Sequence, residues 1–139
     1  MQVIQLNKKT SQKIAVLLMW LLAVMNLGFL LWVVIDPMPT ARFVGLTGAE
    51  PQAYVELRAM YGGLIGGLGI LNLLGALYPK RLPSAVWSTA WTFAGVGTVR
   101  SVSCLILGIG GVQALFALTE LGASLTSFIL LSKLENNSD

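Results

Sequence analysis

Residues 14–35 read IAVLLMWLLAVMNLGFLLWVVI, a run without a single charged side chain. A helix needs about 20 apolar residues to cross the roughly 30 Å hydrocarbon core of a bilayer, and this run has that length. A cleaved signal peptide is the alternative, because Lys8, Lys9 and Lys13 precede the run. The run is longer than the roughly 7–15 apolar residues of such a peptide, and no small-x-small cleavage pattern follows it. We therefore expect a retained membrane-spanning helix.

Three further apolar runs follow, at residues 55–78, 84–107 and 112–131. Turn-forming residues separate the runs: Asp36-Pro37-Met38-Pro39, then Pro79 and Pro83, then Gly108-Ile109-Gly110-Gly111. Hydrophobic residues make up 55% of the chain and charged residues 11%, with a mean hydropathy of +0.77. A soluble domain carries about 25% charged residues. These features predict one all-α domain over residues 1–139, folded as a four-helix transmembrane bundle.

Lysines and arginines in the short connections predict the orientation of the bundle. With four spans, most of them fall on one side of the membrane: Lys8, Lys9, Lys13, Lys80, Arg81 and Lys133. The opposite side carries Arg42, with Arg58 at the membrane edge. We therefore expect both termini in the cytoplasm. The small basic excess fits this orientation better than it fits nucleic-acid binding.

The longest connection is the outer loop at residues 36–54, which carries Phe43, Val44 and Leu46 among glycines and a proline. One interpretation is an ordinary surface loop. The other is a segment lying in the outer membrane interface and capping the bundle, because its apolar residues have no soluble core to join.

Each predicted helix brings a polar residue to the outer half of the membrane. At about 1.5 Å of rise per residue, Arg100 lies roughly 11 Å before the end of its helix, and Glu120 roughly 12 Å after the start of the next. These two residues should therefore meet at one depth. Glu56 and Arg58 open the second span, and Asn26 lies in the first.

A charge at the centre of a membrane helix costs about 2.5–3.5 kcal/mol on insertion scales. A structural Arg100–Glu120 pair that joins two helices would offset this cost. A site for a ligand, an ion or a proton is the alternative, and the sequence leaves both open. The charges of Glu56, Arg58, Arg100 and Glu120 sum to zero, which favours internal pairing.

Helical spacing divides the second span into two neighbouring faces. Arg58, Tyr61, Gly62 and Gly66 share one face with Ile65 and Gly69, while Glu56 shares the other with Gly63 and Gly67. Glycines four residues apart let helix backbones approach closely, so both glycine pairs are candidate packing sites. We expect these faces to line one interior cleft, together with a polar stripe of Gln113, Glu120, Ser124 and Ser127 on the fourth helix.

The residue types argue against catalysis. The chain has no histidine and a single cysteine, Cys104, so a zinc site of the usual type and an internal disulfide are not expected. Cys104 has no histidine to activate it as a nucleophile. We predict no metal, no cofactor, no catalytic residue and no enzymatic activity.

The run ELRAMYGG, residues 56–63, resembles a family of small bacterial membrane proteins of unknown function with four predicted spans. Its hallmark is a Glu-x-Arg-x-x-Tyr-Gly-Gly run that opens the second span. Here those positions are Glu56, Arg58, Tyr61, Gly62 and Gly63. The resemblance implies a four-helix protein of the bacterial inner membrane and implies no activity.

Two functions are consistent with these features. The first is a protein that acts by binding, either as an accessory subunit that packs against other membrane subunits or against itself, or as a holder of a lipid or quinone-like ligand. The candidate polar cluster is Asn26, Glu56, Arg58, Tyr61, Arg100 and Glu120. The alternative is a small transporter or proton-linked carrier that uses the same Glu and Arg residues as its path.

Overall fold

The computed structural model describes residues 8–43 and 51–135, and every secondary-structure element in them is helical. Four helices among these residues are long and apolar enough to cross a membrane: Lys9–Ile35, Gln52–Leu77, Pro79–Leu107 and Val112–Leu134. The prediction of an all-α, four-helix membrane bundle is therefore confirmed. In chain order the elements are α1 (Lys8–Ile35), α2 (Pro37–Phe43), α3 (Pro51–Leu57), η1 (Arg58–Leu64), α4 (Ile65–Leu77), η2 (Pro79–Arg81), α5 (Leu82–Leu107) and α6 (Val112–Glu135).

The second spanning helix is not a uniform α-helix. It consists of α3, the π-helical segment η1 and α4, and η1 coincides with the run RAMYGGL. In a π-helix each N–H bonds to the carbonyl five residues back, so a turn contains more residues than an α-helical turn. Side chains before and after η1 are therefore rotated relative to the faces that a continuous α-helix would give them.

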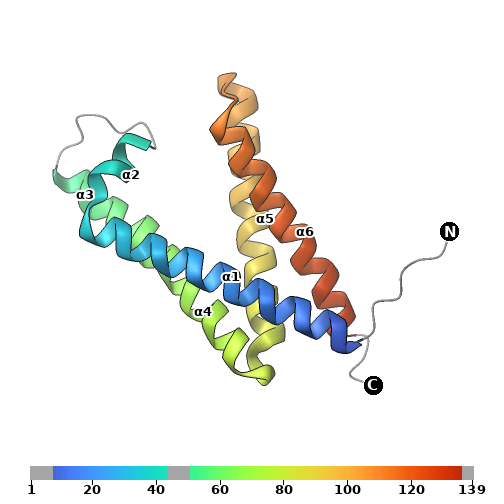
Figure 1. Cartoon of the computed structure of the whole chain (residues 1–139). Helices are drawn as coiled ribbons and strands as arrows, with labels where there is room; N and C mark the ends of the chain where they lie inside the picture. The colour runs from blue at the N-terminus through green and yellow to red at the C-terminus, as the bar shows by residue number, and fades with distance from the viewer. Residues whose placement is uncertain (1–7, 44–50, 136–139) are drawn as a thin grey trace.

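The spanning helices form two pairs arranged as a V (Figure 1). α1 lies beside α4 in one arm, and α5 lies beside α6 in the other. The arms meet where α1 and α5 begin and α6 ends, which we call the closed end, and they diverge toward the opposite end, which we call the open end.

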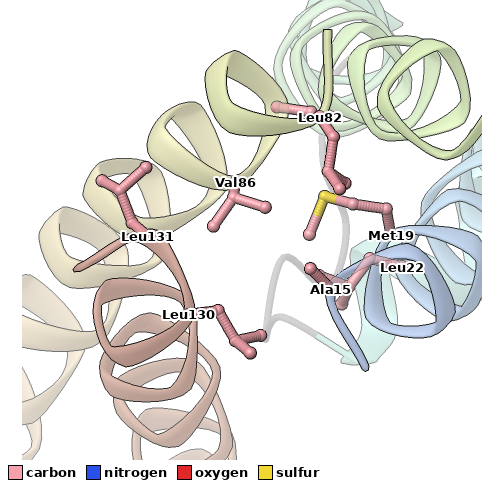
Figure 2. Close-up of a cluster of buried hydrophobic side chains, with 8 residues drawn as sticks. Ala15, Met19, Leu22, Leu82, Val86, Leu130 and Leu131 are labelled. Carbon is pink, nitrogen blue, oxygen red and sulfur yellow. The ribbon is translucent and has the colours of Figure 1, made fainter. Parts of the chain in front are cut away.

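A hydrophobic core joins the two arms at the closed end (Figure 2). Met19 of α1 points toward Leu82 and Val86 of α5, and all three side chains are at most 1% exposed. The remaining buried members of this core are Ala15, Leu22, Ala85, Leu130 and Leu131.

Small residues allow α4 and α5 to approach closely beside this core. A Cβ added at Gly75 of α4 would overlap the Cβ of Ala85 on α5. Because no side chain larger than hydrogen fits at residue 75, this position sets how tightly the arms meet.

Glycines also bring α1 against the second helix, but only on one of the two predicted faces. Gly62 and Gly66 are buried against Leu30, and a Cβ at Gly66 would lie 2.7 Å from its Cδ2. Gly63 and Gly67 are exposed, and a Cβ at Gly67 would meet nothing within 4 Å. The expectation that Gly63 and Gly67 pack inside the bundle is thus wrong for the described chain, because α1 covers only the neighbouring face.

The connection at residues 36–54 is partly helical, since it contains α2 and the start of α3. The ring centroid of Phe43, at the end of α2, lies 5.6 Å from that of Phe116 on α6. This contact reaches from the α1 arm to the α5–α6 arm at the open end, which favours the capping interpretation over a free surface loop. Val44 and Leu46 lie outside the described residues.

Candidate functional site

Arg100 and Glu120 form an ion pair between α5 and α6. Arg100 Nη2 lies 2.9 Å from Glu120 Oε1, and Arg100 Nε donates to both carboxylate oxygens, at 2.9 and 3.2 Å. The side chains are 29% and 13% exposed, respectively. The pairing predicted from equal depth is therefore present in the structure.

The short distance between α5 and α6 at this level depends on Gly97. A Cβ at Gly97 would lie 2.9 Å from Leu121 Cγ and 3.2 Å from Glu120 Cβ, so a side chain here would push the helices apart. The turn that joins the helices is equally tight, because Gly108 and Gly111 have φ values of 64° and 65° that favour glycine. Both features hold Glu120 within reach of Arg100.

Two further residues of α6 surround the guanidinium. Arg100 Nη1 donates to Gln113 Oε1 at 2.8 Å, and Arg100 Cζ lies 5.8 Å from the centroid of the Phe116 ring. A guanidinium has five N–H donors. Glu120 and Gln113 together engage three of them, which leaves one N–H on each terminal nitrogen for another acceptor.

A cleft of about 950 Å³ lies between the two arms. Much of its wall is apolar, contributed by η1 and α4 on one side and by α5 on the other, and its aromatic members include Tyr61 and Trp91. Its polar side chains include Asn26, Arg100, Gln113 and Glu120. We refer to this space as the cleft.

Asn26 is the polar residue that α1 contributes to the cleft. It is 9% exposed, and its Nδ2 has no hydrogen-bond partner within residues 8–43 and 51–135. An unsatisfied buried donor of this kind costs about 1–3 kcal/mol. The Nδ2 atom is itself covered, so a bound molecule would satisfy this donor only when the amide turns toward the cleft.

The structure brings four of the six predicted polar residues to the cleft and leaves two outside it. Asn26, Tyr61, Arg100 and Glu120 line it. Arg58 instead donates through Nε to the carbonyl of Val34 on α1, at 3.3 Å.

Glu56 is exposed and makes no hydrogen bond or ion pair with the described part of the chain. The expectation that Glu56 and Arg58 share a cleft with Arg100 is therefore wrong for the described chain. The reason is geometric: Glu56 lies in α3 and Arg58 is the first residue of η1, while the following residues Met60 and Tyr61 of η1 line the cleft.

A second polar group lies near the closed end, and helix spacing alone did not single it out. Thr89 Oγ1 of α5 donates to Asn72 Oδ1 of α4 at 2.7 Å, and both side chains are fully buried. On α6, Ser124 Oγ donates to the carbonyl of Ala90 at 2.9 Å, while Ser127 Oγ is buried without a partner among the described residues. The predicted stripe on α6 therefore divides between the cleft and the α5–α6 contact.

Metal chemistry has no candidate ligand group in the described ranges, because no three His, Cys, Asp or Glu side chains gather there. Cys104 is a free, half-buried thiol that lines the cleft.

No known family model, curated protein or solved structure matches this chain. The resemblance carried by the Glu-x-Arg-x-x-Tyr-Gly-Gly run therefore stays a prediction.

Proposed function

We propose that this protein acts by binding, and that it holds a lipid or quinone-like amphiphile in the cleft between its two arms. The observation that carries this proposal is a cleft of about 950 Å³ with apolar walls and a small group of polar side chains. Sites for small molecules have volumes of roughly 300–1,000 Å³, with mainly apolar linings and a few convergent polar groups. The cleft fits this description.

An amphiphile suits the cleft because the cleft lies within membrane-spanning segments. The wall residues Leu64, Trp91 and Val99 are exposed, so in a bilayer they would contact lipid chains directly. A molecule dissolved in the bilayer could enter from the side and place its polar group near Arg100. No passage through water would be needed.

The orientation of the chain is part of the same proposal. Lys13, Lys80, Arg81 and Lys133 belong to segments at the closed end, which should therefore face the cytoplasm by the positive-inside rule. Both termini then lie in the cytoplasm, and the cleft belongs to the outer half of a bacterial inner membrane.

The carrier alternative has weaker support. A transport path must continue from the cleft to the other face of the membrane, yet Met19, Leu82 and Val86 close the space between the arms. The exposed Gly63 and Gly67 support a second binding role, because small residues on a lipid-facing surface suit close packing against another membrane helix. An accessory subunit would use that face.

The binding proposal can be tested by filling the cleft. Gly95 of α5 lines the cleft, and a Cβ there would meet nothing within 4 Å, so Gly95→Phe should occupy the space without displacing a neighbour. Gly122→Phe is the matched control, because Gly122 is exposed on α6, has equally open surroundings and does not line the cleft.

The measurement is native mass spectrometry of protein purified in mild detergent, followed by lipid extraction. We expect a bound amphiphile in the unchanged protein and in Gly122→Phe, and at least a tenfold lower occupancy in Gly95→Phe, about 1.4 kcal/mol of binding free energy. Equal occupancy in all three proteins, or none in the unchanged protein, would contradict the proposal.

A further inference from the structure

We infer that the amphiphile is uncharged and presents a hydrogen-bond acceptor, such as a carbonyl oxygen, to Arg100 and Asn26. This inference rests on the proposed binding function and specifies the chemical class of its ligand. It follows from the charge balance of the cleft, the donors left on Arg100 and the unpaired amide of Asn26.

The charge balance of the cleft disfavours an ionic ligand. Arg100 and Glu120 are the oppositely charged side chains of its lining, and they bind each other through three N–H···O contacts. An anionic head group at Arg100 would stand beside the Glu120 carboxylate, in surroundings where like charges repel strongly. A cationic group at Glu120 would face Arg100 in the same way. A neutral ligand avoids both penalties.

Hydrogen-bond donors remain although the charge is neutralised. After the bonds to Glu120 and Gln113, Arg100 retains one N–H on each terminal nitrogen. Donors to a charged group form stronger hydrogen bonds than neutral pairs do, so an acceptor on the ligand would gain from them. A pure hydrocarbon would leave these donors unused.

Asn26 supplies a second polar contact from the opposite arm. Its Nδ2 has no partner in the described ranges, the side chain is nine-tenths buried, and the amide reaches a ligand by turning about its own side chain toward the cleft. Asn26 belongs to α1 and Arg100 to α5, and both line the cleft, so a polar group held between the arms lies between two walls that each carry a donor. This placement favours a head group with acceptor atoms on two sides.

Two kinds of membrane molecule share this chemistry. A long-chain quinone carries ring carbonyls, and a diacylglycerol carries ester carbonyls, while neither has a net charge. The experiment therefore includes both, together with an anionic phosphatidylglycerol and the hydrocarbon squalene.

The test measures retention of these four probes by native mass spectrometry, after the delipidated protein is incubated with phosphatidylcholine nanodiscs that contain one probe each. We expect at least one carbonyl probe to be retained about tenfold more than phosphatidylglycerol and squalene. The carbonyl probe that is retained identifies the source of the ligand.

Two substitutions test separately the two features behind the inference, the Asn26 amide and the charge balance of the cleft. Asn26→Leu keeps a similar volume and should reduce retention of the carbonyl probe about fivefold, as expected for one lost hydrogen bond, without changing squalene retention. Asn72→Leu is the matched control, because Asn72 is buried outside the cleft. Glu120→Gln leaves Arg100 uncompensated and should raise phosphatidylglycerol retention severalfold. If that variant does not fold, Asn26→Leu and the unchanged protein decide the result.

The outcomes distinguish a failure of this inference from a failure of the proposed binding function. If no probe is retained above the level seen with Gly95→Phe, the proposed binding function is wrong, and this inference falls with it. If phosphatidylglycerol or squalene is retained as well as the carbonyl probes, or if Asn26→Leu leaves carbonyl-probe retention unchanged, the inference is wrong while the binding function stands.

Discussion

At the closed end of the molecule, Met19, Leu82 and Val86 fill the space between the two arms, and Gly75 brings α4 directly against Ala85. At the open end, the same four helices enclose a cleft of about 950 Å³. The closed end is joined by small and apolar side chains from α1, α4, α5 and α6. At the open end, the rings of Phe43 and Phe116 contact each other from one arm to the other, with centroids 5.6 Å apart.

The difference shows how a charged pair can lie in a membrane without closing the bundle around it. The guanidinium of Arg100 is bonded to Glu120 and Gln113, which both belong to the α5–α6 arm. Because its charge is balanced within one arm, Arg100 needs no ionic partner from α1 or α4. The other arm can therefore lie apart, and a cleft can persist between them.

The largest expected effect comes from breaking the charged pair at the open end. Arg100→Leu leaves the partly buried Glu120 carboxylate without a cation, and should lower the free energy of unfolding by about 3 kcal/mol, the lower limit for a broken buried pair. The double variant with Glu120→Leu removes both charges and should lose less than Arg100→Leu alone. Unfolding by SDS in mixed micelles measures all the variants.

The Glu120→Leu single variant completes this cycle. A coupling free energy close to zero, so that the two single losses simply add to that of the double variant, would show that the pair does not stabilise the α5–α6 arm.

The second prediction addresses the closed end. Gly75→Ala places a methyl group where Ala85 already lies, so it should lower the free energy of unfolding by about 1–3 kcal/mol, as overpacked cores do. Gly67→Ala is the matched control, because its surroundings are open and alanine is the better helix former by up to about 1 kcal/mol. If the two variants unfold at the same SDS concentration, the tight contact at Gly75 does not hold the arms together.

The smallest effect concerns the buried polar contact near the closed end. Thr89→Val removes the hydroxyl that bonds to Asn72 Oδ1 and should destabilise the protein by about 1 kcal/mol, since interhelical hydrogen bonds in membranes contribute roughly 0.6–2 kcal/mol. Thr126→Val is the control, because Thr126 is exposed and its hydroxyl donates to the carbonyl of Gly122 within its own helix. Thermal unfolding in detergent compares them, and equal midpoints would assign no stabilising role to the Thr89–Asn72 bond.

The positions of the spanning helices and the Arg100–Glu120 pair could be predicted because both depend on counting along the chain. Apolar length identifies a span, and equal distances from a tight turn bring two residues of a helical hairpin to one level. The structure does not group Arg58 with Arg100, and the prediction was wrong because it assumed an α-helical period across residues 58–64. The π-helical segment changes that period, and no simple sequence rule announces it.

By itself, the sequence determined that this chain has four membrane-spanning helices and that Arg100 finds Glu120, because lipid demands long apolar helices and a tight turn restricts its two helices to an antiparallel pair. Only the tertiary structure decided which glycine face α1 covers, that Glu56 and Arg58 lie outside the cleft, and that the hydrophobic core joining the arms lies at the closed end. Those features depend on how α1 and α4 are placed against α5 and α6. That placement arises from contacts such as Met19 with Leu82 and Val86, and Gly66 with Leu30, which join residues far apart in the chain.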